Sequence, residues 1–214
     1  MTRIAIADDH PLVLIGLRRA LEGALGIEVV GEANDSTGLV ALLDKGGVDL
    51  LITDFHMPGG RYGDGGTLVG FLQRRYPKLR IIVITMLTNP LLLQQILSSG
   101  VHSLLLKNAG RDETLHAITT VAAGYTYVGQ SVRELVAAVN VSAAQDGAEA
   151  AQMLSPRELE VLRLFVSGLT VSEIATLQHR SVKTVSHQKV AALRKLGIEN
   201  DRDLYEYGLR NGLI

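Results

Sequence analysis

Short apolar runs alternate with longer amphipathic stretches over the first 125 residues of the chain. The runs that predict strands are Arg3–Ala7, Glu28–Glu32, Leu50–Thr53, Arg80–Thr85 and His102–Leu106. The stretches that predict helices are Leu12–Leu25, Ser36–Lys45, Thr67–Arg75, Pro90–Ser99 and Arg111–Ala123. Residues 50–53 and 81–84 are apolar almost throughout, which is typical of parallel strands covered on both faces. Five strand–helix repeats therefore predict an α/β domain with a doubly wound sheet of five parallel strands.

The C-terminal part of the chain carries signals for helix starts. The expected N-caps of four successive helices are Ser155, Thr170, Ser181 and Asp201. Each of the first two is followed three residues later by a glutamate, which completes a capping box. The third helix is expected over Val182–Leu196, and the fourth is expected to end near Arg210. This spacing predicts a compact all-α domain of four helices.

The segment between these two parts has a different composition. Residues 130–140 have the pattern of one more short helix, whereas residues 141–152 hold mainly small and polar side chains that bury little surface. The expected organisation is an α/β domain at residues 1–125, a short helix and interdomain linker at 126–152, and a helical domain at 153–214.

The composition narrows the class of protein. Of the 214 residues 47% are hydrophobic and 20% are charged, enough apolar material for buried cores. There is no cysteine, which excludes disulfides and thiol chemistry. No apolar run approaches the roughly 20 residues of a membrane helix, and the N-terminus lacks the pattern of a signal peptide. We therefore expect a soluble, cytoplasmic protein without membrane insertion.

The charges are unevenly distributed. Residues 1–152 hold 12 Lys/Arg against 15 Asp/Glu, whereas residues 153–214 hold 9 against 7. No acidic residue lies between Glu173 and Glu199. The basic residues in that interval are Arg180, Lys183, Lys189, Arg194 and Lys195. This local asymmetry is more informative about binding than the net charge of the whole chain.

Charged and hydroxyl side chains stand where four of the predicted strands end. They are Asp8 and Asp9 after the first strand, Asp54 after the third, Thr85 at the fourth and Lys107 after the fifth. In an open parallel sheet, ligands bind beyond the carboxyl ends of the strands, so these groups are expected to meet at one edge. Each alone is more typical of a surface or capping residue, but the ordered set favours a site.

Three neighbouring carboxylates repel one another unless they share a cation. Oxygen ligands in an open site suit Mg²⁺, and an aspartate is a known covalent acceptor of phosphate. Lys107 would supply a positive charge and Thr85 a hydroxyl to the phosphoryl oxygens. The sequence thus predicts a Mg²⁺-dependent phosphoryl-accepting site. The sequence shows no metal-ligand spacing among five of its histidines, which are His10, His56, His102, His116 and His179.

These motifs, with Met57-Pro58 after Asp54, resemble the receiver domain of bacterial response regulators, which has a flavodoxin-like fold. The resemblance implies that Asp54 is the phosphoacceptor and that a histidine kinase or histidine phosphotransfer protein is the donor. It also implies that Asp9 ligates Mg²⁺ directly, Asp8 through water, and His56 through its backbone carbonyl.

Three features depart from that family's pattern. Asn108 stands where a proline usually follows the lysine, which puts the customary cis peptide in doubt, and Leu104 replaces an aromatic switch residue. The coupling of phosphorylation to the opposite face is therefore expected to be weaker or to use other side chains. The glycine-rich loop Gly59–Gly66 is either a flexible cover near the site or a long turn.

Two C-terminal helices, Glu173–His179 and Val182–Leu196, are joined by a short turn, which is typical of a helix-turn-helix. The second is expected to pack through an apolar face that consists of Val182, Val185, Ala192, Leu193 and Leu196. The predicted DNA-contacting residues are Thr170, Lys183, Thr184, Ser186, His187, Gln188, Lys189 and Arg194. A protein-binding module with a solvated basic face is the alternative that charge alone leaves open.

The motifs around Leu154–Glu158, Ser172–Ala175 and Leu193–Gly197 resemble the LuxR/NarL-type DNA-binding domain, and several loops resemble the capsule-synthesis regulators of that family. The combined resemblance implies a two-domain transcriptional regulator in which phosphorylation changes dimerisation and binding to inverted or direct promoter half-sites. It also implies a homodimer, or a heterodimer with another regulator.

Other functions are less compatible with the residues. An aspartyl phosphatase of the haloacid-dehalogenase type needs a second aspartate two residues after the nucleophile, where this chain has His56. A nucleotide-binding Rossmann enzyme needs a glycine-rich loop where Asp8 and Asp9 stand. We therefore expect no enzyme. A regulator that binds DNA without phosphorylation, and whose first domain serves for (hetero)dimerisation, stays open.

Overall fold

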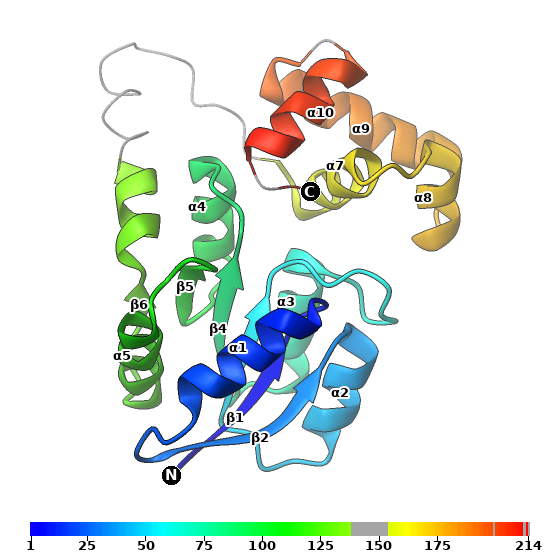
Figure 1. Ribbon diagram of the computed structural model, residues 1–214. Coiled ribbons are helices and arrows are strands. Elements are labelled where there is room, and N and C mark those ends of the chain that lie inside the picture. Colours follow the sequence, from blue (N-terminus) through cyan, green and yellow to red (C-terminus); the bar gives the residue numbers. More distant parts are fainter. Residues whose placement is uncertain (138–153, 199, 212, 214) are drawn as a thin grey trace. The chain divides into compact units, whose positions relative to one another are not determined.

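The computed structural model describes residues 1–137, 154–198, 200–211 and 213 (Figure 1). The chain divides into two compact units. The first contains Met1–Thr85 and Ile96–Glu134, and the second contains Met86–Gln95 and Leu135–Ile214. The predicted linker at 141–152 lies outside the described residues, and of the short helix expected at 130–140 the described part, 130–137, is helical.

The first unit is built on a parallel sheet with the strand order β2-β1-β3-β4-β5-β6 (Figure 1). Its strands are β1 (Thr2–Ala7), β2 (Ile27–Ala33), β3 (Leu50–Asp54), β4 (Arg80–Thr85), β5 (Ser103–Leu106) and β6 (Tyr127–Val128). All neighbouring pairs are parallel. The predicted doubly wound α/β fold is confirmed. The sheet has six strands rather than the predicted five, because the two-residue strand β6 adds to its edge.

Helices follow the first five strands: α1 (Pro11–Leu21), α2 (Ser36–Asp44), α3 (Gly65–Arg75), α4 (Pro90–Ser98) and α5 (Arg111–Ala122). The first helix is shorter than predicted and ends before Gly23 and Gly26, which both adopt positive φ. These two positions favour glycine because a side chain is strained in that conformation.

Apolar residues cover both faces of this sheet. Side chains such as Ile6, Ile52 and Ile84 point to one face, where they form a core with residues of α1 and α5. Their strand neighbours Leu51 and Val83 point to the other face and are also fully buried. Burial on both faces explains why these strands read as continuous apolar runs.

The C-terminal part of the second unit contains four helices: α7 (Pro156–Val166), α8 (Val171–Leu177), α9 (Val182–Leu196) and α10 (Asp201–Arg210). Both predicted capping boxes are present, at Ser155 and at Thr170. Ser181 caps α9 as predicted. The cap of α10 is Asn200 rather than the predicted Asp201, because the Asn200 side chain accepts a hydrogen bond from the backbone N–H of Asp203.

The helices of this part pack around a small core that includes Val161, Ile174 and Val185. The buried face of α9 differs in part from the predicted one: Val185 and Ala192 are fully buried, whereas Val182 is 51% exposed. In the described part of the chain, no helix combines the length and the apolar character required to cross a membrane.

Candidate metal centre and candidate nucleic-acid interface

The predicted acidic residues meet at one edge of the sheet. Asp8 follows β1 and Asp54 ends β3, and these two strands are adjacent and parallel, so both residues lie at the same carboxyl edge. Carboxylate oxygens of Asp8, Asp9 and Asp54 and a ring nitrogen of His10 lie within 4.8 Å of one another. The side chain of Asp8 is 1% exposed, that of Asp54 6% and that of Asp9 25%. The cluster is therefore buried at its base and open to solvent on the side of Asp9.

Lys107 lies at the same edge, directly after β5, and contacts two of these carboxylates. Its Nζ is 2.8 Å from Asp8 Oδ2 and 2.8 Å from Asp54 Oδ2. Burial by itself lowers the pKa of Lys107, but the hydrogen bonds to Asp54 and Asp8 and their negative charges outweigh it, so the pKa is raised. The ammonium therefore stays protonated and holds two buried carboxylates together.

Thr85 ends β4, which lies between β3, the strand of Asp54, and β5, the strand that precedes Lys107. It is 2% exposed, and its backbone carbonyl accepts a hydrogen bond of 2.8 Å from the Lys107 N–H. The strand order β1-β3-β4-β5 thus places Asp8, Asp54, Thr85 and Lys107 in succession along one edge. The structure brings together the residues that the strand ends predicted.

The donor set fits a hard divalent cation. Counted with their formal charges, three carboxylates and one ammonium leave a net charge of about −2 on neighbouring groups, which an ion of charge +2 balances. Carboxylate oxygens are the ligands that such an ion prefers. The geometry is therefore suitable for a metal of the Mg²⁺ class.

His10 is a member of this cluster that the sequence analysis set aside. Its Nδ1 is 2.8 Å from Asp9 Oδ1 and 3.3 Å from Asp8 Oδ1, and its backbone N–H donates to Asp8 Oδ1 at 2.9 Å. Spacing rules for metal-binding histidines do not detect this contact, because the partners of His10 are its immediate neighbours in the sequence. Its direct succession to Asp8 and Asp9 was the available signal.

The loop Gly59–Gly66 is anchored to the protein, which decides between the two sequence interpretations. The backbone N–H of Arg61 donates to Thr37 Oγ1 at 2.9 Å, and that of Tyr62 donates to Ser36 Oγ at 3.2 Å. A Cβ at Gly60 would overlap Ser36, so this close approach requires glycine. These contacts favour the long turn over the flexible cover, and the last two residues of the range, Gly65 and Gly66, already belong to α3.

Asp64 within this turn contacts the residues that follow the candidate acceptor. Its Oδ1 accepts hydrogen bonds from the backbone N–H groups of Met57 and Gly65, both at 2.7 Å, and its Oδ2 lies 2.6 Å from His56 Nδ1. Burial raises the pKa of Asp64 to about 6, although the two backbone N–H groups act in the opposite direction. Asp64 was not predicted from the sequence, since a loop aspartate carries no periodic signal.

The two substituted positions, Leu104 and Asn108, stand on either side of Lys107 in the sequence. Leu104 is fully buried in β5, where it pairs with Val83 and Val128. There is no cis peptide bond in the parts of the chain that the structure describes, so the Lys107–Asn108 bond is trans. This agrees with the doubt that Asn108 raised about a cis peptide at this position.

Helices α8 and α9 form the predicted helix-turn-helix. The connection runs through Gln178, His179 and Arg180, and His179 adopts a positive φ of 52°. The N–H of Arg180 bonds to the carbonyl of Ala175 at 2.8 Å, which closes the end of α8. The second helix therefore begins at a fixed angle after a short, hydrogen-bonded turn.

One face of α9 is exposed and carries basic and polar side chains. Lys183, His187, Val190 and Arg194 follow one another at intervals of three or four residues and are all exposed. The neighbouring Ser186 is exposed as well. Val190, 60% exposed, was missed by the sequence analysis, which treated apolar residues of this helix only as core.

Other predicted DNA contacts are already engaged within the domain. Lys189 lies on the face of α9 shared with Val185, and its Nζ is 2.6 Å from Asp201 Oδ1 and 3.5 Å from the centroid of the Phe165 ring. Gln188 Oε1 accepts a hydrogen bond from Arg180 at 3.4 Å. Lys189, with its side chain 12% exposed, thus fastens α9 to its neighbours, and the exposed face of the helix presents other residues.

Predicted contacts at the helix starts also act as caps. Thr170 Oγ1 donates to Glu173 Oε2 at 2.7 Å and accepts from the Glu173 N–H at 3.3 Å. The hydroxyl of Thr184 lies 2.7 Å from that of Ser181, the cap of α9. Both side chains remain exposed, so capping leaves them accessible to solvent.

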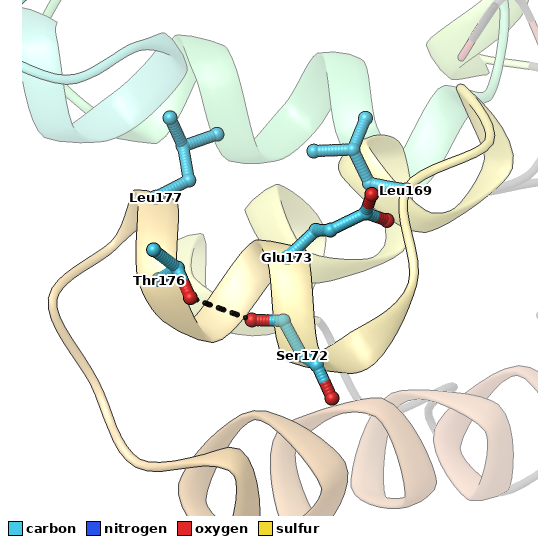
Figure 2. Close-up of a pocket in the computed structure, with 5 residues that line it drawn as sticks. All are labelled: Leu169, Ser172, Glu173, Thr176 and Leu177. Carbon is cyan, nitrogen blue, oxygen red and sulfur yellow. Dashed lines mark hydrogen bonds between the residues drawn. The ribbon is translucent and has the colours of Figure 1, made fainter.

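Helix α8 carries an open groove of a different character (Figure 2). The groove has a volume of about 490 Å³ and is lined by Leu169, Ser172, Glu173, Thr176 and Leu177. Figure 2 shows Thr176 turned back toward the Ser172 carbonyl, to which it donates a hydrogen bond of 3.0 Å. Hydrogen bonds from the N–H and hydroxyl of Thr170 lower the pKa of Glu173, which keeps it ionised. An apolar lining with a carboxylate is unfavourable for a phosphate backbone, which favours α9 as the nucleic-acid face.

Comparisons with known proteins agree with this geometry. Residues 4–119 match the family described as response regulator receiver domain, and residues 152–207 match the family described as bacterial regulatory proteins, luxR family. The chain belongs to the response regulators that join a receiver domain to a luxR-type helix-turn-helix domain. It is therefore a two-component regulator of transcription and not an enzyme, and the phosphatase alternative is set aside.

Several relatives cover nearly the whole chain. The transcriptional regulatory protein RcsB of Salmonella typhi is 43% identical over 204 residues, which cover 95% of this chain and 92% of RcsB. The oxygen regulatory protein NreC of Staphylococcus aureus is 34% identical over 217 residues, which cover 99% of both chains.

Solved structures of RcsB are similar as well. A structure of Salmonella typhimurium RcsB has 42% identity and a TM-score of 0.80, and the match covers 96% of each chain. A second, bound to the promoter rprA in the presence of the phosphomimetic BeF₃⁻, has 41% identity and a TM-score of 0.79, and the match covers 96% of this chain and 97% of RcsB. The resemblance to the capsule-synthesis regulators is thus confirmed at the level of the family.

Proposed function

We propose that this chain is a cytoplasmic bacterial regulator that receives a phosphoryl group on Asp54 and thereby changes its dimerisation and its binding to promoter DNA. The donor would be a histidine kinase or a histidine phosphotransfer protein. The observation that carries the proposal is the contact of the Lys107 ammonium with both Asp8 and Asp54 at 2.8 Å, at the carboxyl edge of the sheet. That arrangement pairs a candidate nucleophile with a positive charge for the incoming group.

The residues support an in-line transfer. A carboxylate oxygen of Asp54 attacks phosphorus, and the bond between phosphorus and the donor's imidazole nitrogen breaks, with its electron pair leaving on the donor. Lys107 then moves its hydrogen bond from the Asp54 oxygen to a phosphoryl oxygen, and the Thr85 hydroxyl donates to another. The burial of Asp54 limits access of water to the acyl phosphate.

Mg²⁺ would be held by the carboxylates of Asp8, Asp9 and Asp54 and by the backbone carbonyl of His56. When bound, the ion supplies positive charge that offsets the charge of the phosphoryl oxygens. Support comes from the net charge of about −2 that the three carboxylates and Lys107 leave at this edge.

DNA binding is proposed for the exposed face of α9. Lys183 and Arg194 would contact phosphates, His187 and Ser186 would meet base edges, and Val190 would contact a thymine methyl group. Of the other predicted contacts, Thr170 and Thr184 remain candidates for phosphates, whereas Lys189 and Gln188 are assigned to holding the helix in place. One module of this size reads one half-site, so a dimer on inverted or direct half-sites is proposed.

The relatives support this part of the proposal. RcsB structures have been solved with the promoters rprA and P1flhDC in the presence of BeF₃⁻, and one contains two RcsB dimers bound to two parallel DNAs. By analogy, the phosphorylated form of this chain binds promoter DNA as a homodimer, or as a heterodimer with another regulator.

A second candidate is a regulator that binds DNA without phosphorylation and uses its first domain for (hetero)dimerisation. The observation that favours it is Leu104, which is buried in the sheet where the family has an aromatic switch residue. A buried leucine cannot swing between an inner and an outer position as an exposed aromatic side chain can.

One experiment separates the two candidates. Promoter fragments are first recovered by genome-wide footprinting of the purified protein, and their affinity is then measured for wild type and Asp54→Asn, each with and without acetyl phosphate in Mg²⁺. Phosphorylation-dependent regulation predicts tighter binding with the donor for wild type only. Equal affinity in all four cases would support the second candidate instead.

A further inference from the structure

Asp64 accepts a hydrogen bond from the peptide group whose carbonyl is a proposed ligand of the metal site. The carbonyl of His56 and the N–H of Met57 belong to the same planar peptide group. This peptide is trans, since no cis bond occurs in the described residues, so its N–H and its carbonyl point in opposite directions. The N–H donates to Asp64 Oδ1 at 2.7 Å. By fixing the N–H, Asp64 fixes the direction of the His56 carbonyl.

The second oxygen of the same carboxylate holds the residue that carries this carbonyl. Asp64 Oδ2 is 2.6 Å from His56 Nδ1, and the two side chains are 11% and 29% exposed. The Asp64 carboxylate therefore contacts the peptide on one side and the imidazole on the other. His56 has little freedom to rotate about its own backbone while both contacts persist.

Capping of α3 does not account for these contacts. An N-cap needs one side-chain oxygen for the free N–H groups of the first turn, and Asp64 Oδ1 provides that contact to Gly65 at 2.7 Å. Asn200, the N-cap of α10, shows the ordinary case: its Oδ1 accepts from the Asp203 N–H at 2.9 Å. The contacts of Asp64 to residues 56 and 57 are additional to capping.

The support of Asp64 is itself rigid. The turn that carries it is tied to Ser36 and Thr37 of α2, and Tyr62 stacks on Phe71 with ring centroids 4.8 Å apart. The N–H of Gly65 also bonds to the carbonyl of Phe55 at 3.0 Å. A carboxylate mounted on such a frame can impose a direction on a neighbouring peptide.

From this geometry we infer that Asp64 is a positioning residue for the phosphorylation site, which orients the His56 carbonyl toward the divalent cation. The inference rests on the proposed function, because that function gives the carbonyl its role. Partners that orient a metal ligand typically change metal affinity by about 10- to 100-fold when they are removed.

The test compares Asp64→Ser with Asn200→Ser, a cap of the other unit, in the full-length chain. Serine keeps an N-cap acceptor in both variants but is too short to reach residues 56 and 57. Mg²⁺ affinity is measured by isothermal titration calorimetry without phosphodonor, and folding is checked by circular dichroism. We expect Asp64→Ser to bind Mg²⁺ about 10-fold more weakly than wild type, and Asn200→Ser to bind it within about 2-fold of wild type, since that cap belongs to α10 in the other unit.

Two outcomes would overturn the inference, because both fit a merely structural role of Asp64. In the first, Asp64→Ser folds and binds Mg²⁺ as tightly as wild type. In the second, both serine variants lose Mg²⁺ affinity equally. Asp64→Asn keeps an acceptor for the Met57 N–H and should recover part of the affinity. If the serine variant does not fold, Asp64→Asn decides by hydrogen exchange. Faster exchange of the Met57 amide together with weaker Mg²⁺ binding supports the inference, and faster exchange of that amide with unchanged Mg²⁺ binding refutes it.

Failure of the proposed function has a different signature. Wild type would then take up no label from acetyl phosphate in Mg²⁺, whatever the effect of Asp64. If wild type is labelled and the Mg²⁺ affinity of Asp64→Ser is unchanged, the positioning role alone is wrong.

Discussion

The acidic edge of the sheet and the exposed face of α9 are both proposed to bind phosphate, and they are built in opposite ways. At the edge, a small group of side chains is buried, and its members contact one another. The Lys107 ammonium bridges Asp8 and Asp54. On α9, Lys183, His187 and Arg194 are exposed and spread along the helix. A buried, connected site depends on every member, whereas dispersed surface contacts add up almost independently. Substitutions at the two regions should therefore differ in size and in character.

The largest effect on stability is expected for Lys107→Ala. Two buried carboxylates lose the ammonium that they share, so the first unit should be destabilised by about 3 kcal/mol at neutral pH in EDTA. Mg²⁺ should restore part of this loss. Thermal unfolding with and without Mg²⁺ measures both effects, and the exposed Lys78→Ala serves as the control. Equal stability of Lys107→Ala and wild type in EDTA would contradict the bridging role.

The next effect concerns DNA affinity. The double substitution Lys183→Ala/Arg194→Ala should weaken binding to any sequence and reduce the slope of log affinity against log salt by about 2, since each residue is assigned one phosphate contact. Fluorescence anisotropy at several salt concentrations gives this slope. Lys45→Ala removes an exposed charge from the first unit and should leave the slope unchanged. A slope equal to that of wild type would show that Lys183 and Arg194 of α9 do not contact phosphates.

A smaller effect distinguishes the two faces of α9. Lys189→Met should lower the stability of the C-terminal unit by about 1 kcal/mol, because it loses the contacts with Asp201 and the Phe165 ring. The salt slope of DNA binding should stay as in wild type. Chemical denaturation and the same anisotropy series provide the two values. A slope reduced by about 1, the value for one phosphate contact, would show that Lys189 reaches DNA.

The smallest effect is expected for Val190→Ala. Loss of a contact with a thymine methyl should weaken binding to a recovered promoter fragment roughly 3-fold. Binding to non-specific DNA and the salt slope should not change. Competition with unrelated DNA tests this, and an equal loss on both kinds of DNA would assign Val190 a structural role.

The same comparison explains what the sequence could predict. The acidic site was predictable because continuous apolar runs mark buried strands, and parallel strands bring Asp8, Asp54, Thr85 and Lys107 to one edge. The two-residue strand β6 was missed, since two residues show no periodicity. Asp64 was missed because its partners are set by the path of a turn rather than by a repeat.

On α9 the sequence predicted the bounds of the helix but not the orientation of each residue. Lys189 was placed among the DNA contacts as one of the polar residues near the start of the second helix of the helix-turn-helix. Its spacing of four from Val185 and three from Ala192 puts it on the buried face, where its ammonium contacts Phe165 and Asp201. The same spacing applied to Lys183 and His187 identifies Val190 as exposed. Helical periodicity is therefore a better guide to this interface than residue type.

The most direct test of the central claim is the site of phosphoryl transfer. Purified wild type and Asp54→Asn are incubated with acetyl phosphate and Mg²⁺, with Asp112→Asn as an exposed-carboxylate control, and the label is located by peptide mass spectrometry. The account predicts one phosphoryl group on the peptide that contains Asp54 in wild type and in Asp112→Asn, and none in Asp54→Asn. Full labelling of Asp54→Asn would contradict the assignment of the acceptor.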